Sequence, residues 1–144
     1  MTKMIDISSK DITQRTARAR GEITLMKTTI EDVAKGKIKK GDVLSTAQIA
    51  AILAVKNTPN LIPLCHNIPI DSVNVSFDIG DETISCECQV KSHYKTGVEM
   101  ESLVGVTVAL LNIWDMVKYL EKDDEGQYPD TFISNIRVIS KQKG

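Results

Sequence analysis

The chain has 144 residues, of which 42% are hydrophobic, so it can form one core but is too short for two ordinary domains. Eighteen basic and nineteen acidic residues leave a formal charge of -1, which excludes a strong overall attraction to nucleic acid or to an anionic membrane. We expect a single domain over residues 1–144, in which any basic site is local.

The cysteines and the start of the chain bear on its cellular location. No apolar run approaches the roughly 18 residues that a membrane span needs, and residues 1–11 mix charges with hydroxyls. The three cysteines cannot all pair, and Cys86 and Cys88 lack the spacing of a zinc ribbon or a redox C-x-x-C motif. We therefore expect a soluble protein of the reducing cytoplasm, with no membrane partner.

The first predicted strand covers residues 14–26, which mix β-compatible residues with arginines. Thr28 or Thr29 is then expected to cap a short helix. The end of this helix is predicted at Gly36, because glycine readily adopts the left-handed conformation that closes a helix.

A second helix is predicted from the capping box Ser45-Thr-Ala-Gln48 to about Lys56. Its residues are apolar on nearly every side. Such a helix has to be covered by more than one neighbour. The cover is either a sheet and another helix or a sheet and another subunit.

Polar and apolar residues alternate from Ser72 to Ile79 and again from Ile84 to Val90, with Gly80-Asp81 between the two runs. This pattern predicts a β-hairpin with one dry face. Cys86 and Cys88 both fall on that face. We interpret them as inert core thiols, with a metal or redox role as the less favoured alternative.

The longest predicted helix runs from about Gly97 to Leu120, with apolar residues at spacings of three and four. A closing strand is expected from about Phe132 to Ile139. The order of strand, two helices, two strands, helix and strand is close to the ferredoxin-like pattern. We therefore predict an α+β fold, with a ferredoxin-like antiparallel sheet and helices packed on one face.

Two loops hold polar residues that a core does not need. Lys40-Gly-Asp-Val43 leads into the second helix, whose first amides could receive an anion; a solvated loop with an N-cap is an equally supported alternative. In residues 61–69, we expect a rigid extended loop that points Cys65 and His66 to opposite sides, so they should not form a nucleophile and base pair. His66 either holds a substrate group or is a satisfied core histidine.

A third group of polar residues lies on the longest predicted helix. Thr96 and Glu99 match a capping box, which would be structural, but Glu101 is not explained that way. Asp115 and Lys118 share a helix face, either as a surface ion pair or as a relay that orients a catalytic ammonium. Glu101 and Asp115 are about 21 Å apart at ~1.5 Å per residue. If both ends serve catalysis, the site should be shared between subunits.

Four motifs occur in the order and spacing of one protein family: Lys40-Gly-Asp-Val43, Leu61-Ile-Pro-Leu-Cys-His66, Lys95-Thr-Gly-Val-Glu-Met-Glu101 and Asp115-Met-Val-Lys118. The chain resembles the MoaC family from Asp6 to Ile139, and four motifs together are far more specific than any one. It departs from the family's pattern at its end, where Lys141-Gln-Lys-Gly144 stands in place of a glycine-rich tail. We expect phosphate contacts near the C-terminus to differ accordingly.

The resemblance implies a ferredoxin-like subunit assembled as dimers into a homohexamer, with active sites at the dimer interface. It also implies a lyase of molybdenum cofactor (molybdopterin) biosynthesis. The family converts 3′,8-cyclo-7,8-dihydroguanosine triphosphate into cyclic pyranopterin monophosphate, with release of pyrophosphate. We expect no cofactor and no metal ligands.

The resemblance implies catalytic roles for Asp115, Lys118 and Lys40. Residues implied in substrate binding are Leu64, Cys65, His66, Glu99, Met100, Glu101 and Arg18. Arg18 resembles a strand position that contacts the triphosphate, with Arg15 and Arg20 as secondary candidates. An ammonium of lowered pKa can serve as acid and base, and positive side chains can stabilise the pyrophosphate leaving group.

Two rival functions come from other classes of protein. A non-catalytic ligand-binding module would need anion-holding groups but not Asp115 with Lys118. A nucleic-acid binder is poorly supported, because aromatic residues make up only 4% of the chain and the net charge is slightly negative. We therefore expect no nucleic-acid partner.

Overall fold

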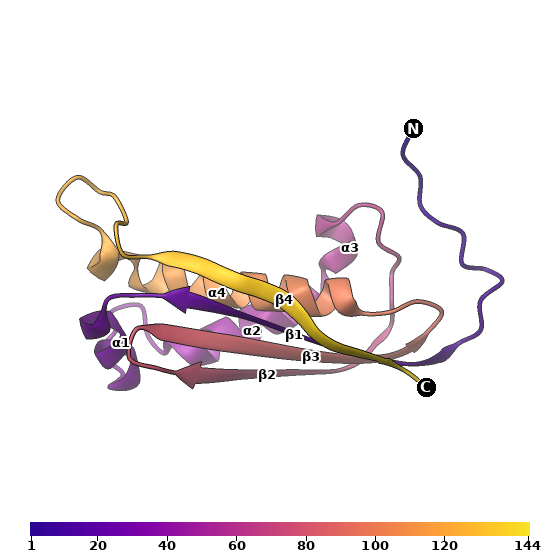
Figure 1. Ribbon diagram of the computed structural model, residues 1–144, viewed down its shortest axis with the longest axis horizontal. Helices are drawn as coiled ribbons and strands as arrows, with labels where there is room; N and C mark the ends of the chain where they lie inside the picture. The colour runs from indigo at the N-terminus through magenta and orange to yellow at the C-terminus, as the bar shows by residue number, and fades with distance from the viewer.

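The computed structural model describes residues 1–144, and Figure 1 shows its elements. They are β1 (Thr13–Thr24), α1 (Lys27–Ala34), α2 (Val43–Lys56), α3 (Thr58–Leu61), β2 (Ile70–Ile79), β3 (Thr83–Tyr94), α4 (Glu99–Glu121) and β4 (Phe132–Lys143). The strands form one antiparallel sheet in the order β2-β3-β1-β4. The predicted ferredoxin-like α+β fold is confirmed.

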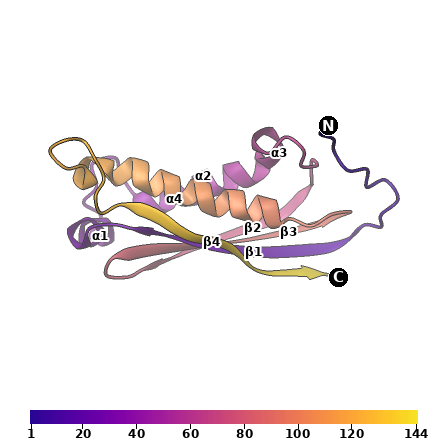
Figure 2. The ribbon, with the colours of Figure 1, turned by 45° about the horizontal axis from the view of Figure 1, so that its top comes forward.

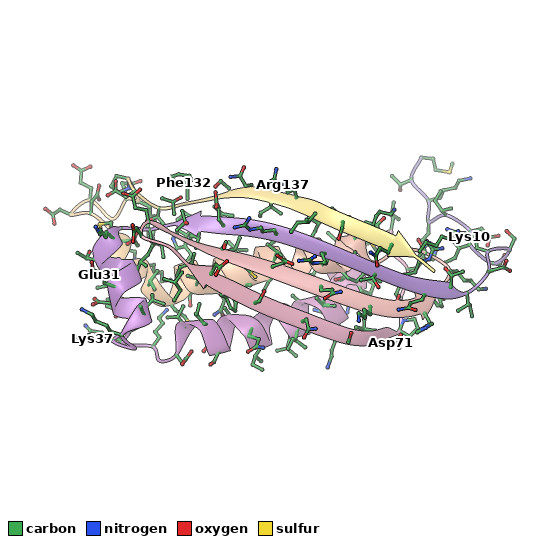
Figure 3. The ribbon with its side chains drawn as sticks, turned by 60° about the horizontal axis from the view of Figure 1, so that its bottom comes forward. Lys10, Glu31, Lys37, Asp71, Phe132 and Arg137 are labelled. Atoms are coloured by element: carbon green, nitrogen blue, oxygen red, sulfur yellow. The ribbon has the colours of Figure 1, made fainter.

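The sheet has a helix-covered face and an open face. Figure 2 shows α2 and α4 lying along one face, and Figure 3 shows the opposite face, where side chains such as Arg137 project from the strands. On β1 the buried residues alternate strictly with less buried ones, and the buried set is Arg15, Ala17, Ala19, Gly21 and Ile23. This alternation follows from the period of two in a strand, and it decides which arginines can approach the helices.

The long helix α4 packs closely on the sheet at two glycines. A Cβ atom at Gly21 would lie 2.9 Å from side-chain atoms of Val106 and Ile136, and one at Gly105 would lie 2.8 Å from Cys88 Sγ. Neither position has room for a side chain without rearrangement. The backbone of α4 is therefore held at a fixed height above β1 and β3, which also fixes the positions of the polar groups at its two ends.

By length and hydropathy alone, α4 could cross a membrane, contrary to the expectation that no apolar run is long enough. Val106, Leu110, Ile113 and Val117 on this helix have no exposed surface and belong to the core. The helix is apolar because it packs against β1, β3 and α2, as the central helix of a domain does.

The predicted strands and hairpin are confirmed, although β4 extends four residues beyond Ile139. Cys86 and Cys88 are buried on the helix-covered face, where desolvation raises the pKa of each thiol to about 12. Both thiols therefore stay protonated and unreactive at neutral pH, in agreement with their interpretation as core residues.

The predicted helix caps are wrong in all three cases. Thr29 is buried inside α1 and donates its hydroxyl to the Glu121 carboxylate instead of capping the helix. Helix α2 begins two residues before Ser45, and Asp42 is its cap, accepting from the Ser45 N–H at 2.8 Å. Helix α4 begins after Val98 with no side-chain cap. At α1 a long-range partner, and at α2 a neighbouring residue, competes successfully with the predicted capping pattern.

Candidate active site

Three charged residues meet near the C-terminal end of α4, and we call them the lysine–aspartate cluster. Lys40 Nζ lies 3.1 Å from Asp115 Oδ2 and donates a second hydrogen bond to the Asp115 carbonyl at 2.9 Å. Lys118 Nζ lies 3.1 Å from the other carboxylate oxygen, Oδ1. The Asp115 carboxylate therefore bridges two ammonium groups, one from its own helix and one from the loop before α2.

A tight turn presents Lys40 to α4. The Gly41 N–H donates to the Ile38 carbonyl at 3.1 Å, which closes a four-residue turn with Lys39 and Lys40 in its middle. Gly41 has a φ of 116°, a conformation that favours glycine, and Ile38 is buried beneath the turn. The predicted motif is thus confirmed as a loop of defined shape that leads directly into the Asp42 cap.

The charges in the lysine–aspartate cluster are mutually stabilising. Hydrogen bonds from Lys40 and then Lys118, followed by the charges of the two lysines, lower the pKa of Asp115 below its usual value, and desolvation opposes them in part. The three side chains keep 44%, 58% and 42% of their surface exposed for Lys40, Asp115 and Lys118. An exposed triad of this kind adds little to stability, but it fixes two ammonium groups where a ligand can reach them.

A shallow hollow of about 340 Å³ adjoins the cluster. Asp115 and Lys118 line it together with Leu111, Trp114 and Tyr128. The two aromatic rings meet edge to face, with centroids 5.2 Å apart. The ammonium of Lys118 therefore borders a surface that is partly aromatic and wide enough for a small planar group.

A second group of polar residues surrounds the N-terminal end of α4, and we call it the amino-terminal cluster: Cys65, Glu99, Glu101, Arg15 and Lys141. Lys141 Nζ of β4 lies 3.1 Å from Glu99 Oε1. Burial alone would raise the pKa of Glu99, but the bond from its own N–H and the bond and charge of Lys141, helped by Arg15, lower it overall. The Glu99 carboxylate lies directly over Gly97, and a Cβ atom at Gly97 would overlap with it.

Glu101 differs from Glu99 because it is almost fully buried, with 2% of its surface exposed. Desolvation raises the pKa of its carboxyl group, its own backbone N–H opposes that effect in part, and the nearby charge of Glu99 adds a smaller increase. Burial, followed by the charge of Glu101, also raises the pKa of Cys65. Cys65 is therefore a protonated thiol beside a carboxyl group that holds a proton more tightly than an exposed glutamate does.

Arg15 reaches this cluster from the helix-covered face of β1. It is 8% exposed, and its Nη2 donates to the Lys95 carbonyl at 3.4 Å. Arg15 Nε and Glu99 Oε2 are both buried and have no hydrogen-bond partner within the chain. Buried polar atoms normally have partners, so these two are suited to bind a polar ligand.

His66 lies in a loop that is less extended than predicted, because the Cys65 N–H donates to the Ile62 carbonyl at 3.1 Å and closes a turn. His66 Nε2 lies 2.6 Å from the Ile5 carbonyl, and a carbonyl only accepts, so this nitrogen carries the proton. Cys65 instead faces Glu101. The two neighbours therefore have separate partners and do not form a nucleophile and base pair.

Comparisons with known proteins agree on one family. The model of the MoaC family matches residues 4–144. A probable cyclic pyranopterin monophosphate synthase of Pyrococcus horikoshii is 58% identical over 98% of this chain and 89% of its own length. One of Thermococcus kodakarensis is 57% identical over 99% of this chain and 91% of its own. A Methanothermobacter thermautotrophicus protein named as a probable accessory protein of that synthase is 57% identical over 98% and 89%.

This chain belongs to the MoaC family. Of the residues that the family resemblance singles out, the structure brings Lys40, Asp115 and Lys118 together in one cluster. It places Cys65, Glu99 and Glu101 together in the other, at the opposite end of the helix. Leu64 and Met100 are exposed by 47% and 38% beside this second cluster in the chain.

Arg18 lies apart from both clusters of this MoaC chain. It is on the open face of β1, where its guanidinium pairs with Glu87 of β3. Arg20 lies on the same open face, opposite Arg137 of β4. Within one subunit, Arg15 is therefore the only one of the three β1 arginines on the same face of the sheet as α4.

Two members of the amino-terminal cluster are clearer in the structure than in the sequence. Arg15 was a secondary candidate, although it shares the strand parity of Ala17, Ala19 and Ile23, which is a signal that sequence does contain. Lys141 was seen only as part of a shortened tail. Its contact with Glu99 joins residues 42 apart, and no local pattern announces it. No three His, Cys, Asp or Glu side chains lie together as a metal-binding group.

Proposed function

We propose that this chain is a cyclic pyranopterin monophosphate synthase of molybdenum cofactor biosynthesis. Its substrate is 3′,8-cyclo-7,8-dihydroguanosine triphosphate, and its products are cyclic pyranopterin monophosphate and pyrophosphate. The observation that carries the proposal is the Asp115 carboxylate bridging Lys40 and Lys118 at 3.1 Å each, in a chain whose family is established. Rebuilding a purine into a pyranopterin needs several proton transfers, and this cluster has the groups to perform them.

In this proposal Lys40 and Lys118 are the acid and base groups. Both are anchored to the same carboxylate, so their separation is fixed before substrate arrives. Asp115 is negatively charged at neutral pH, and the two lysines, Lys40 first, lower its pKa below the usual value of an aspartate. Its role is to orient the ammonium groups and to stabilise positive charge on them during turnover.

The amino-terminal cluster has groups suited to the rest of the substrate. Arg15 and Lys141 supply positive charge for phosphate oxygens, and the unpartnered Arg15 Nε adds a donor. Burial raises the pKa of Glu101 and of Cys65, so the thiol and, when it holds a proton, the carboxyl group can each donate a hydrogen bond to a ring nitrogen or carbonyl. We propose Arg15, in place of Arg18, as the arginine that contacts the triphosphate within this cluster.

We propose that one active site combines the two clusters from two different subunits. The clusters lie at opposite ends of α4, about 21 Å apart at ~1.5 Å per residue, which is too far for one small substrate. The outward side of α4 between them is apolar: Leu111 is 52% exposed, Met100 is 38% exposed, and Val104 and Val108 are half-buried. On the neighbouring α2, Ile49 and Leu53 are 58% and 61% exposed.

A second copy of the chain fits this apolar surface better than a different partner does. If two α4 helices pack antiparallel about a twofold axis beside Val108, position 101 of one helix lies level with position 115 of the other. The lysine–aspartate cluster of each subunit would then face the amino-terminal cluster of the other, so the dimer would have two combined sites. The same contact would cover the exposed apolar residues of α2 and α4, which explains the apolar character that sequence indicated for α2.

The larger assembly and the cellular location remain part of this proposal. Three such dimers would form a homohexamer, and the free cysteines Cys65, Cys86 and Cys88 are compatible with the reducing cytoplasm. The mass of the protein in solution, measured by light scattering, tests the assembly. A monomer at micromolar concentration would contradict the shared site.

The first test is formation of product and pyrophosphate from the cyclised dihydro-GTP substrate. Lys40→Ala and Asp115→Asn should each lower kcat by about 10²–10⁴-fold, as expected when a positioned acid or base is lost. Matched controls are Lys56→Ala and Asp124→Asn, which change exposed residues that belong to neither cluster and should retain activity. Full activity in Lys40→Ala would contradict the proposed role of the lysine–aspartate cluster.

A ligand-binding module without catalysis is the rival that this assay also tests. Such a module would bind the triphosphate through the cationic groups, yet release no pyrophosphate. Binding measured by calorimetry without product formation by the natural chain would therefore favour the rival. The bridged carboxylate supports the enzyme, because a module that only binds anions gains nothing from placing Asp115 between its two cations.

The shared site has a separate test in mixed assemblies of two inactive variants. Lys40→Ala damages only the lysine–aspartate cluster, and Glu101→Gln damages only the amino-terminal cluster. If a site takes one cluster from each subunit, random mixing after reversible dissociation leaves about a quarter of the sites intact. Activity near a quarter of the natural value supports the shared site, and mixtures as inactive as the separate variants contradict it.

A further inference from the structure

One turn of helix beyond Asp115, the side chain of Tyr119 contacts the same turn that presents Lys40. Tyr119 Oη accepts a hydrogen bond from the Lys39 N–H at 2.9 Å. Lys40 Nζ, one residue later in the loop, donates to Asp115. Residues four apart on a helix lie one above the other, so α4 holds this turn at two points on one face.

The backbone N–H of Lys39 is not used by the hydrogen bond that closes the turn. That bond joins the Gly41 N–H to the Ile38 carbonyl at 3.1 Å, which leaves the Lys39 N–H pointing away from the turn. Tyr119 uses that donor, and its ring also lies under the Lys39 ammonium, with Nζ 5.3 Å from the ring centroid. Two contacts of different kinds therefore hold the residue that directly precedes Lys40.

We propose that Tyr119 is a positioning residue for the reaction, which holds the backbone of Lys39 so that the Lys40 ammonium meets the Asp115 carboxylate. The proposal rests on the proposed catalytic role of Lys40. A lysine side chain has four rotatable carbon–carbon bonds, so the place of its nitrogen depends on where the backbone is held. A displacement of about 1 Å in a reacting group can lower a rate by as much as 10²-fold.

The contact is poorly explained as a contribution to folding. Lys39 is exposed, so water can replace the phenol as acceptor when the protein is folded without it. The ring of Tyr119 is half-buried and would still pack if the hydroxyl were removed. Unlike a water molecule, the Tyr119 hydroxyl holds the loop at a fixed position relative to α4.

The test uses Tyr119→Phe, which removes the hydroxyl and keeps the ring. We expect kcat to fall by about 3- to 30-fold with little change in KM, because the damage concerns the placement of a reacting group. The matched control is Tyr94→Phe, which removes a hydroxyl from a half-buried tyrosine at the end of β3 and should leave both constants unchanged. Loss of stability without change in kcat would overturn the proposal.

A titration of Asp115 by carbon NMR gives a readout that a purely structural role would not move. Two charged groups face this carboxylate, Lys40 from the turn and Lys118 from its own helix, and Lys40 makes the largest contribution to lowering its pKa. Tyr119→Phe should therefore raise the pKa of Asp115, as Lys40→Ala should do more strongly. An unchanged Asp115 titration in folded Tyr119→Phe would overturn the proposal.

Hydrogen exchange in the natural chain provides a measurement that needs no variant. The Lys39 amide should be protected, although the residue is exposed and in a loop, because its hydrogen bond to Tyr119 is the one that shields it. Exchange at the rate of an unstructured peptide would overturn the proposal even if Tyr119→Phe does not fold. The exchange and titration results do not depend on turnover, so they remain decisive if the natural chain forms no product.

Discussion

Two carboxyl groups at opposite ends of α4 are equally buried and have very different surroundings. Glu101 and Glu121 are each 2% exposed. The Glu121 carboxylate accepts from the Met26 N–H at 3.1 and 3.2 Å, from the Thr131 hydroxyl at 2.7 Å and from the Thr29 hydroxyl. No other residue donates a hydrogen bond to Glu101, and the nearest charge is another carboxylate, Glu99.

The difference separates a structural carboxylate from a functional one. Glu121 ties the end of α4 to the entrance of α1 and the start of β4, so its donors repay the cost of burial. Glu101 carries that cost with only its own backbone N–H as compensation. A buried group that destabilises its own fold, beside a protonated thiol and an unpartnered arginine nitrogen, indicates a site selected for binding or chemistry.

The largest expected effect comes from removing the satisfied carboxylate. Glu121→Ala leaves two buried hydroxyls and a backbone N–H without an acceptor, so the free energy of unfolding should fall by about 3 kcal/mol or more. Chemical denaturation measures it, with Glu125→Ala as the control, because that side chain is exposed. Equal stability of the two variants would show that the Glu121 contacts are not formed in solution.

Glu101→Gln should change stability in the opposite direction. The amide has nearly the same shape and no charge to desolvate, so the free energy of unfolding at pH 7 should rise by about 1–3 kcal/mol. Product formation should nevertheless fall at least about tenfold, because an amide cannot take up and release a proton as the Glu101 carboxyl group can. A destabilised Glu101→Gln protein would contradict the contrast with Glu121.

The pH dependence of stability sharpens the same contrast. Burial raises the pKa of Glu101 in the folded state, so the native protein binds a proton more tightly than the unfolded chain does. The stabilisation of the native protein by this tighter proton binding is fully present below the ordinary pKa of a glutamate. It is lost as the pH rises through the raised pKa of Glu101. The stability gained in Glu101→Gln should therefore be small at low pH and grow through this window. A gain that does not vary with pH would exclude ionisation of Glu101 as its cause.

The smallest effect on stability is expected for the partner of Glu99. Lys141 is 61% exposed, so Lys141→Ala should alter the free energy of unfolding by no more than about 1 kcal/mol. It should raise the pKa of Glu99, which Lys141 helps to lower, and weaken binding of the triphosphate several-fold. Lys143→Ala changes an exposed lysine on the same strand and serves as the control. Identical binding by the two variants would remove Lys141 from the proposed phosphate contacts.

Much of the fold could be predicted because its patterns are local. Alternation of period two identified β2 and β3 and placed Cys86 and Cys88 on the buried face, and spacings of three and four identified α4. The same reasoning applied to β1 would have placed Arg15 on the helix face and Arg18 on the open face. The role of Thr29 at the start of α1 could not be predicted, because its hydroxyl binds a carboxylate 92 residues away in the sequence.

The candidate site shows where such reasoning stops. A spacing of three predicted that Asp115 and Lys118 share a face, and it placed Glu101 far along the same helix. The contact of Lys40 with Asp115 joins residues 75 apart, and here only the family resemblance grouped them. The contact of Tyr119 with Lys39 joins residues 80 apart and had no signal at all.

The sequence by itself therefore determined the elements, the faces of the strands and the separation of the two ends of α4, because these depend on periods of two and 3.6 residues along the chain. Only the tertiary structure decided which polar groups are buried with partners and which without. Burial and hydrogen bonding depend on residues brought together from distant parts of the chain, and no local pattern records them.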